Sequence, residues 1–271
     1  MKTVLIEPRG FCFGVRRALE MLEKALPQKP YVLHKIVHNK GIIRDFEAKG
    51  VRFVDDLSAV PDGATVVFSA HGVSRAVEEQ AACKHLTVID TTCPFVKKVH
   101  THVERLARAG YAVLFIGKKK HAEVVGTLGR LPPETRVFVI EKEADIPEGL
   151  EQVGVATQTT LSQTETAGLL ARIQKLYPTA QLQNGICLAT TERQAAVKAC
   201  SCPSIVVVGD AHSSNAKRLV EVAQAAGKRA YLVETPADAV GLDLTEPVGL
   251  TAAASAPESV VQAVQDVLNR R

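Results

Sequence analysis

The sequence predicts an α/β protein built from three similar small units with mostly parallel sheets. Apolar, β-branched runs alternate along the chain with amphipathic stretches, which is typical of βαβ units. Cysteines followed at similar distances by polar residues also recur, at Cys12, Cys93 and Cys187, with intervals of 81 and 94 residues. The alternation indicates the fold class, and the recurrence indicates three divergent copies of one unit.

Strands are expected wherever short apolar runs end at turn residues, and helices wherever apolar residues recur at helical spacing. The expected strands are 2–6, 31–33, 51–54, 65–70, 87–90, 111–116, 136–140, 153–157, 204–208, 229–233 and 248–252. The expected helices include 14–26, 95–108, 163–176, 191–199, 215–226 and 257–269. In the helix at 191–199, Thr191 and Gln194 have the spacing of a capping box at its start.

The bulk composition is that of a globular protein with a substantial core. The 271 residues are 46% hydrophobic and 23% charged, and the net charge is only +4. The sequence has no basic stripe with interleaved aromatic residues, so nothing in it indicates a nucleic-acid partner. The apolar runs near Met1 and at 205–208 are too short for a secretory signal or a membrane span. We therefore expect a cytoplasmic protein, in which cysteines are more often metal ligands or catalytic groups than disulfides.

Each of the three cysteines follows a strand or a short loop and precedes a helix. A polar residue lies 26 to 28 positions after each cysteine, at His38, His121 and Ser213. A second polar residue closes a later strand in each copy, at His71, Thr159 and Ser255. Because ligands bind at the carboxyl ends of parallel strands, three copies around a pseudo-threefold axis would gather three thiols inside a ring of polar groups. The expected domains are 13–93, 94–184, and 1–12 together with 185–271.

Three thiolates suit an iron–sulfur cluster with one missing ligand. A cubane cluster takes four thiolates, so three leave one iron open to substrate, whereas zinc with three cysteines normally adds a histidine. An open iron can act as a Lewis acid, and a cluster can also deliver electrons. The remaining cysteines fall outside the repeat: we expect Cys83 to be structural, and Cys200 and Cys202 not to bind metal.

The residues alone leave several polar positions with ordinary interpretations. Glu123 reads as a solvated surface carboxylate, and Ser213 or Ser214 as a simple helix N-cap. The basic run 118–120 is interpreted as a solvated face, with an extra contact to an anionic substrate or a docking patch for an acidic partner as alternatives. Five histidines read as satisfied structural residues: His34, His85, His100, His102 and His212.

Nine ordered motifs resemble one known family over essentially the whole chain. They are PRGFCFGVRRA (8–18), IVHN (36–39), FSAHGVS (68–74), DTTCPFVKKVH (90–100), HAEVVGTLG (121–129), TQTTLS (157–162), ICLATTERQ (186–194), SSNAKRL (213–219) and TAAASAPE (251–258). They closely resemble the LytB/IspH family of 4-hydroxy-3-methylbut-2-enyl diphosphate reductases. One departure is Ala122, which stands where the family commonly has proline.

The resemblance implies a trefoil of three α/β domains around a central 4Fe-4S cluster held by Cys12, Cys93 and Cys187. The apical iron would be open to substrate, and its loss would leave a 3Fe-4S form. Family members use two electrons and two protons to remove the allylic hydroxyl of their substrate. The products are isopentenyl and dimethylallyl diphosphate, in the last step of the methylerythritol phosphate route to isoprenoids. Ferredoxin- or flavodoxin-type proteins supply the electrons.

The resemblance also assigns the substrate site. It makes Glu123 the proton donor, with Thr159 at the reacting end of the substrate. The diphosphate ligands it implies are His38, His71, His121, Ser213, Ser214, Asn215 and Ser255. Two other functions stay open. One is an iron–sulfur hydro-lyase, which would use the same ligands but with the open iron acting only as a Lewis acid. The other is a non-enzymatic metal-binding or phosphate-sensing protein, which would not need Glu123.

Overall fold

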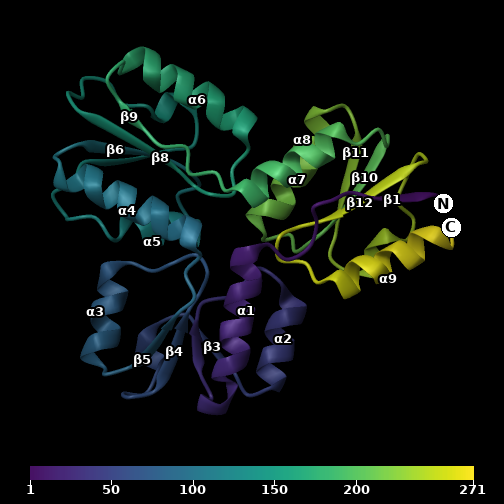
Figure 1. The fold of residues 1–271 in the computed structure, drawn as a ribbon, viewed down its shortest axis with the longest axis horizontal. Helices are drawn as coiled ribbons and strands as arrows, with labels where there is room; N and C mark the ends of the chain where they lie inside the picture. The colour runs from purple at the N-terminus through teal and green to yellow at the C-terminus, as the bar shows by residue number, and fades with distance from the viewer. The chain divides into compact units, whose positions relative to one another are not determined.

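The computed structural model describes residues 1–271, and Figure 1 shows their path as a ribbon. The chain divides into two compact units. The first unit comprises Met1–Arg16, Val37–Ile43 and Cys187–Arg271, and the second comprises Arg17–Ile36 and Arg44–Ile186.

The first unit contains one parallel four-stranded sheet of order β1-β12-β10-β11. Its strands are β1 (Thr3–Leu5), β10 (Ser204–Val208), β11 (Arg229–Val233) and β12 (Val248–Ala252). Its helices are α7 (Leu188–Ala199), α8 (Ser214–Ala225) and α9 (Glu258–Asn269), with a 3-10 turn at Pro236–Ala239.

Helices cover both faces of this sheet, which explains why β10 is apolar at every position after Ser204 (Figure 1). Successive side chains of a strand point to opposite faces. Ile205 and Val207 therefore pack in the core shared with Leu219 of α8, and Val206 and Val208 pack in the core shared with α9. The register places Val206 opposite Leu250 of β12, so both central strands contribute to the core shared with α9.

The second unit contains two parallel four-stranded sheets, of order β3-β2-β4-β5 and β7-β6-β8-β9. The first has β2 (Tyr31–Leu33), β3 (Arg52–Val54), β4 (Thr65–Phe68) and β5 (Thr87–Asp90). The second has β6 (Ala112–Ile116), β7 (Val137–Ile140), β8 (Val153–Thr157) and β9 (Gln181–Leu182). The helices are α1 (Phe13–Ala25), α2 (Lys40–Ala48), α3 (Arg75–Cys83), α4 (Pro94–Arg108), α5 (Ala122–Leu128) and α6 (Gln163–Leu176). The first residues of α1 and α2 belong to the other unit, and 3-10 turns lie at Leu26–Gln28, Leu57–Ala59 and Glu143–Asp145.

Alternation along β6 again separates two cores. Val113 and Phe115 pack in the core shared with Val103 of α4, whereas Leu114 packs in the core shared with Ile173 of α6. The α4 core also takes in Val124 of α5 and so fixes the start of that short helix against the sheet. This contact matters because α5 carries a predicted site residue, Glu123.

The three sheets share one strand order, which confirms the prediction of three similar parallel α/β repeats. When the strands of each repeat are numbered in chain order, every sheet has the spatial order second, first, third, fourth. In the first unit, β1 takes the place of the fourth strand and pairs with β12. Cys12, Cys93 and Cys187 each follow a fourth strand, namely β1, β5 and β9. The exits of the first strands carry His38, His121 and Ser213, and the exits of the third strands carry His71, Thr159 and Ser255. The exact domain boundaries stay a prediction.

All eleven predicted strands are present. The structure differs from the prediction in one short strand, in three helices of nine residues or fewer, and in the start of α7. Strand β9 and helices α2, α3 and α5 are not among the predicted ranges. The predicted start of a helix at 191 is wrong, because α7 begins at Leu188 with Cys187 as its N-cap. Thr191 lies inside the first turn, where its hydroxyl donates to the Cys187 carbonyl, so no capping box forms there. No helix has the length and apolar character needed to cross a membrane.

Two glycines provide a matched test of the packing. A Cβ at Gly154 of β8 would lie 2.5 Å from the Leu106 side chain of α4, whereas a Cβ at Gly168 of α6 would meet nothing within 4 Å. We expect Gly154→Ala to lower the free energy of unfolding by about 1–3 kcal/mol, because the core is overpacked. Gly168→Ala should raise it by about 0.5–1 kcal/mol, because alanine restricts the unfolded chain and suits a helix. Urea unfolding of both variants measures the difference, and equal effects would contradict the packing described.

Candidate active site

The three predicted cluster cysteines all stand at helix starts. Cys93 is the N-cap of α4, Cys187 is the N-cap of α7, and Cys12 directly precedes α1. All three are partly buried. The N–H groups at a helix start attract negative charge, so each cysteine stands where a bound anionic group would be stabilised. The backbone helps to place two of them: the Cys12 N–H donates to the Ala254 carbonyl and the Cys93 N–H donates to the Ala70 carbonyl.

A buried arginine accompanies two of these cysteines in the first unit. Arg193 is 4% exposed, and its guanidinium donates to the carbonyls of Gly10 at 2.8 Å and Ala189 at 2.9 Å. Burial lowers the pKa of Arg193, and the charges of Cys12 and Cys187 oppose that change. Its Nε atom is buried without a hydrogen-bond partner. Three cysteines at helix starts, two of them beside a buried cation, fit an anionic, thiolate-ligated iron–sulfur group.

The sequence reasoning did not single out Arg193. The available signal was its place within the motif that follows Cys187. Its burial, however, follows from the packing of α7 and from the Gly10 carbonyl, which lies 183 positions earlier in the chain.

The other cysteines differ from the three in their surroundings. Cys83 is exposed at the end of α3, and Cys200 closes α7 just before β10. Cys202 is buried, and that burial raises the pKa of its thiol to about 11. A thiol with so high a pKa stays protonated at neutral pH and is a poor metal ligand.

Glu123 is a buried carboxyl group, so its reading as a surface carboxylate is wrong. It lies in the first turn of α5 and is 1% exposed. The Thr159 N–H donates to Oε1 at 2.7 Å, and the Thr159 hydroxyl donates to Oε2 at 2.7 Å. Burial raises the pKa of Glu123 to about 7, and the two hydrogen bonds from Thr159 partly oppose this rise. The carboxyl group is therefore poised to hold or release a proton near neutral pH.

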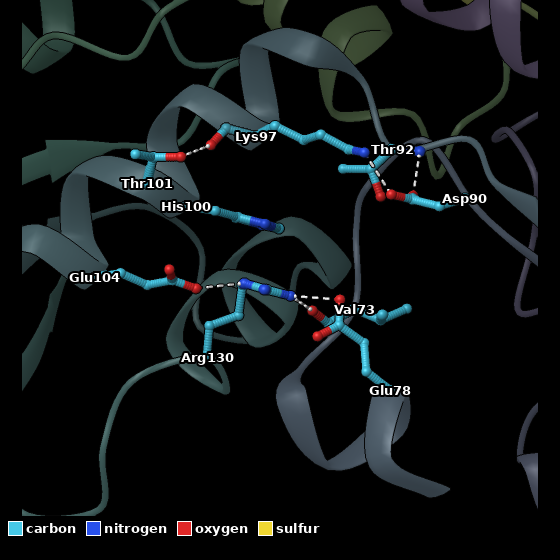
Figure 2. A pocket seen from close by; sticks show the side chains of 9 residues that line it. All are labelled: Val73, Glu78, Asp90, Thr92, Lys97, His100, Thr101, Glu104 and Arg130. Atoms are coloured by element: carbon cyan, nitrogen blue, oxygen red, sulfur yellow. Dashed lines mark hydrogen bonds and ion pairs between the residues drawn. The ribbon is translucent and has the colours of Figure 1, made fainter. Parts of the chain in front are cut away.

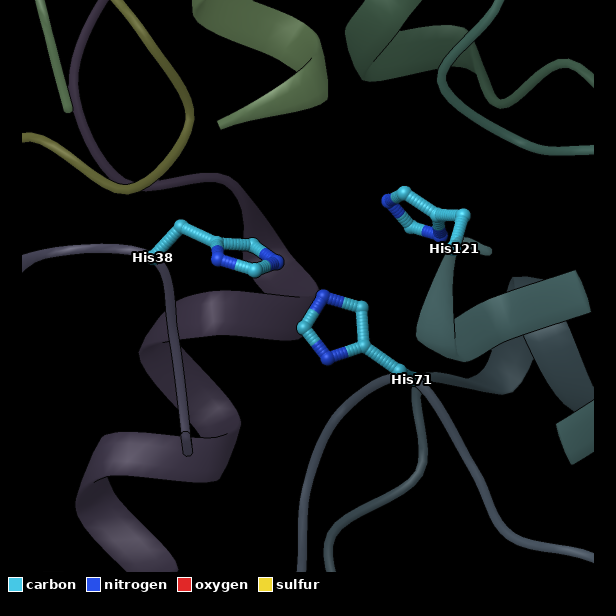
Figure 3. Close-up of side chains that lie close together, drawn as sticks. All are labelled: His38, His71 and His121. Carbon is cyan, nitrogen blue, oxygen red and sulfur yellow. The ribbon is translucent and has the colours of Figure 1, made fainter. Parts of the chain in front are cut away.

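Two histidines lie close to each other in the same unit (Figure 3). The rings of His71 and His121 meet edge to face with their centroids 5.6 Å apart. His121 is the N-cap of α5, and its Nδ1 accepts from the Glu123 N–H at 3.2 Å. In a neutral ring the proton of His121 is therefore on Nε2, which makes that atom a hydrogen-bond donor. The Ser69 hydroxyl lies 3.3 Å from Nδ1 of His71.

The first unit brings together predicted polar residues from three loops. The Ser255 hydroxyl donates to the His38 carbonyl at 3.1 Å, and Asn215 Oδ1 accepts from the Ala254 N–H at 3.0 Å. Ser213 is the N-cap of α8, as its cap interpretation expected, and its hydroxyl accepts from the Ala216 N–H. Ser213, Asn215 and Ser255 are buried, while His38 and Ser214 are half-buried.

Asn39 also contacts this cluster of the first unit, and sequence reasoning missed it. Its amide donates to the Ser255 carbonyl at 3.1 Å, and its Oδ1 accepts from the Ile42 N–H in the first turn of α2. An asparagine directly before a helix is a common N-cap, and this was the signal available. The signal was not used because helix α2 itself was not predicted.

The basic loop before His121 has exposed lysine side chains at Lys118, Lys119 and Lys120. Two side chains fix its backbone: the Lys118 N–H donates to Gln158 Oε1 at 3.0 Å, and the Lys119 N–H donates to Glu141 Oε1 at 2.7 Å. The loop therefore has a fixed backbone with solvated side chains. Its use as a phosphate contact or docking patch stays a prediction.

Comparisons with known proteins agree with this arrangement. A family model described as LytB protein matches residues 3–269. A protein of Haemophilus influenzae (strain PittEE) is 43% identical over 284 residues, covering 100% of this chain and 90% of that protein. A protein of Phenylobacterium zucineum (strain HLK1) is 44% identical over 287 residues, with the same coverage. Both are named 4-hydroxy-3-methylbut-2-enyl diphosphate reductase.

Two solved structures are also similar. The E-1-hydroxy-2-methyl-but-2-enyl-4-diphosphate reductase of Plasmodium falciparum superimposes with a TM-score of 0.90 at 37% identity, covering 99% of this chain and 88% of that one. A structure of (E)-4-hydroxy-3-methyl-but-2-enyl diphosphate reductase, described as the terminal enzyme of the non-mevalonate pathway, has a TM-score of 0.73 at 32% identity over 100% of both chains. The fold class expected from the resemblance is confirmed.

The raised pKa of Glu123 predicts how its carboxyl group titrates and how stability depends on pH. Because the folded protein binds this proton up to about pH 7, while an unfolded chain releases it near the ordinary glutamate pKa of 4.5, the free energy of unfolding should fall as pH rises through that window. Glu123→Gln should lack this dependence. Thr159→Val removes a hydroxyl donor and should raise the pKa further. Carboxyl infrared bands, measured as wild type minus Glu123→Gln across pH, report the titration. A band already fully ionised at pH 5 would contradict the assignment.

Proposed function

We propose that this chain, which belongs to the LytB protein family, is a 4-hydroxy-3-methylbut-2-enyl diphosphate reductase. The family match spans residues 3–269, and the relatives cover this chain completely. The reaction replaces the allylic hydroxyl by hydrogen, with two electrons and two protons, and releases water with isopentenyl and dimethylallyl diphosphate as the last step of the isoprenoid pathway. The observation that carries the proposal is the buried Glu123 carboxyl, with its pKa near neutrality, held by Thr159.

The relatives favour a reductase over the hydro-lyase. Both are named reductases, and so are the two solved structures. A hydro-lyase moves no net electrons, whereas the named reaction consumes two. The phosphate-sensing alternative gives no reason for a proton-carrying carboxyl group buried at 1% exposure.

Cys12, Cys93 and Cys187 are proposed to hold one 4Fe-4S cluster, which would be found as 3Fe-4S after loss of one iron. Support comes from their shared place after the fourth strand of each repeat, from their position at helix starts, and from the buried Arg193 beside two of them. When bound, such a cluster supplies electrons and, at the iron without a thiolate, a Lewis acid for the substrate hydroxyl.

Glu123 and Thr159 are proposed to deliver the proton that leaves with the hydroxyl as water. The Thr159 N–H fixes one carboxyl oxygen, so the other oxygen and the Thr159 hydroxyl share the remaining hydrogen bond. A hydroxyl both donates and accepts, so it can accept the proton of the neutral acid while donating its own to a substrate oxygen. Burial keeps the acid protonated until that transfer, since it disfavours the carboxylate.

The diphosphate is proposed to bind to donors at the exits of the first and third strands of the repeats. These donors are His38, His71, His121, Ser213, Ser214, Asn215 and Ser255. The Nε2–H of His121 is one such donor, because Nδ1 is already engaged by the Glu123 N–H. Ser213 and Ser214 lie at the start of α8, where backbone N–H groups and the helix dipole favour an anion.

The reaction needs an external reductant, and we propose a ferredoxin- or flavodoxin-type protein as its source. The proposal follows from the family and from the two-electron stoichiometry. The division into units 13–93, 94–184 and 1–12 with 185–271 belongs to the same proposal, since each range holds one complete sheet. A cytoplasmic location stays a prediction.

Glu123→Gln tests the proposed acid. We expect turnover to fall by roughly 10²–10⁴-fold, the range typical of a lost general acid, while KM and the cluster chromophore stay near wild type. Anaerobic assays with dithionite-reduced viologen measure turnover, and iron analysis checks the cluster. Wild-type protein should be inactive without reductant. Turnover without reductant would refute the reductase, and near-normal activity of the variant would refute the role of Glu123.

Cys93→Ser and Cys83→Ser form a matched pair for the ligand set. Cys93 is a partly buried helix cap after a fourth strand, whereas Cys83 is exposed at the end of α3. We expect Cys93→Ser to lose most bound iron and the brown absorbance, because a thiolate ligand is gone. Cys83→Ser should retain both. Anaerobic iron and sulfide analysis measures the cluster content of both variants. A full cluster in Cys93→Ser would show that Cys93 is not a cluster ligand.

A further inference from the structure

The turn that carries His71 is packed directly against a histidine of a neighbouring helix. Gly72 follows His71 and has a φ of +78°, a conformation that side chains rarely adopt. A Cβ at Gly72 would lie 2.5 Å from Cε1 of His100 and 3.1 Å from its Nε2. The imidazole of His100, on α4, therefore occupies the space beside the backbone of Gly72, one residue from the proposed diphosphate ligand.

The same turn also contacts helix α5, which carries Glu123. A Cβ at Gly126 would lie 2.8 Å from the Gly72 carbonyl oxygen, and a Cβ at Gly129 would lie 2.4 Å from the Ser74 Cβ. Two glycines thus allow the end of α5 to touch the backbone of this turn. The His71 turn is in contact with both α5 and His100, so a shift of either changes where His71 lies.

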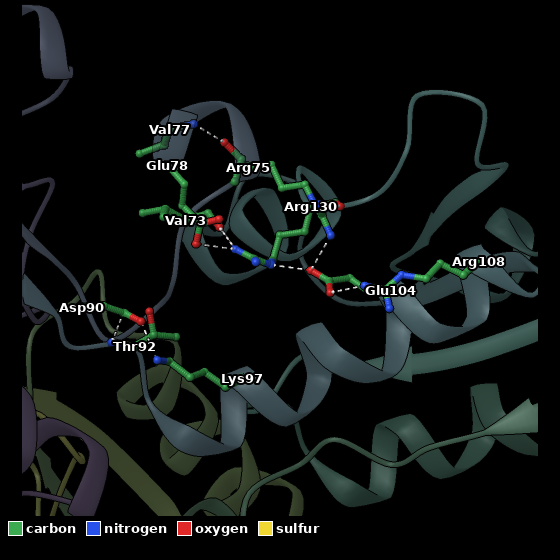
Figure 4. A network of polar contacts seen from close by, with 11 residues as sticks. Val73, Arg75, Val77, Glu78, Asp90, Thr92, Lys97, Glu104, Arg108 and Arg130 are labelled. Carbon is green, nitrogen blue, oxygen red and sulfur yellow. Dashed lines mark hydrogen bonds and ion pairs between the residues drawn. The ribbon is translucent and has the colours of Figure 1, made fainter. Parts of the chain in front are cut away.

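Arg130 ties these elements together from the residue after Gly129 (Figure 4). Its Nη1 donates to the Val73 carbonyl at 3.2 Å and pairs with Glu78 at 2.9 Å, and its Nε pairs with Glu104 at 2.7 Å. Glu104 lies one helical turn after His100 on α4. The side chains of Arg130 and Glu104 are only 18% and 14% exposed, so the ion pair between them is shielded from solvent, whereas Glu78 is 46% exposed.

His100 itself is not held by a polar partner, which corrects its interpretation as a satisfied structural histidine. It is 6% exposed, and its Nε2 is buried without a hydrogen bond. The ring lines a cavity of about 200 Å³ between Lys97 and Arg130, as Figure 2 shows. Burial, together with the charge of Arg130, lowers the pKa of His100 to about 4, so the ring is neutral at pH 7. Burying a polar atom without a partner is costly, and a purely structural position would favour an apolar residue.

His102 shows what a structural histidine on the same helix looks like. It is also 6% exposed, but its Nε2 lies 3.2 Å from the Val155 carbonyl of β8, and its Nδ1 lies 3.2 Å from the guanidinium of Arg105. His102 therefore contacts the sheet, whereas His100 contacts the His71 turn.

We propose that His100 is a positioning residue of the diphosphate site, which sets the place of His71 by filling the space between α4 and Gly72 while Arg130 holds α4 and α5 against the same turn. The inference rests on the proposed function, in which His71 binds the diphosphate. It extends that site to a residue that acts through the backbone and contacts no substrate.

The test compares His100→Ala with His102→Ala and His71→Ala in the cluster-loaded enzyme with dithionite-reduced viologen. We expect His71→Ala and His100→Ala each to raise KM by about tenfold or more, with kcat changed less than about threefold, the pattern of lost binding common to ground and transition states. His102→Ala should lower the melting temperature at least as much and leave KM near wild type. His100→Gln, which keeps much of the bulk, should show a smaller rise in KM and carries the test if His100→Ala does not fold.

Three outcomes would overturn the inference. One is a KM of both His100 variants within about twofold of wild type while that of His71→Ala rises, which leaves the proposed function standing. Another is an equal rise of KM in His102→Ala, which would make the effect general loss of structure. The third is an unchanged KM in His71→Ala, which would refute the assignment of His71 and this inference with it.

Discussion

The direction of the strands constrains everything else in this molecule. Within each sheet all four strands run parallel, so the loops that follow them leave at one edge. The same strand order in each sheet then gives each repeat three equivalent exits, after its first, third and fourth strands. Cysteines follow the fourth strands, while histidines, a threonine and serines follow the first and third. A chain with antiparallel pairs would send half of these residues to the opposite edge.

Burial then decides the chemical state of each group at these exits. Glu123 loses its solvent and gains only hydrogen bonds from Thr159, so its pKa rises to about 7 and it can carry a proton. Arg193 is buried as well, but it keeps its charge because carbonyl oxygens and the neighbouring Cys12 and Cys187 offset the loss of water. Only Glu123 thus reaches a pKa at which it exchanges a proton near pH 7, whereas Arg193 remains a cation beside two of the proposed cluster cysteines.

Close backbone approach supplies the positional accuracy that hydrogen bonds alone do not. Gly72, Gly126 and Gly129 let a helix and a turn touch where any side chain would separate them. The imidazole of His100 and the ion pairs of Arg130 then fill and lock the same junction. Because packed contacts of this kind tolerate little displacement, the junction transmits the position of α4 to the exit of β4. A proposed ligand and a proposed acid are thereby fixed relative to each other within the second unit.

The sequence by itself determined the local pattern and its repetition. Apolar runs marked every strand except the two-residue β9, because covered parallel strands need apolar side chains on both faces. The recurrence singled out Cys12, Cys93 and Cys187, since a repeated unit places equivalent residues alike. The tertiary structure alone decided which polar groups are buried. Glu123 and Thr159 lie 36 residues apart in the sequence, and His100 contacts Gly72, 28 residues earlier. The local sequence around each residue therefore cannot indicate either contact. The start of α7 likewise depends on Cys187 being extended, which a cap pattern at Thr191 could not show.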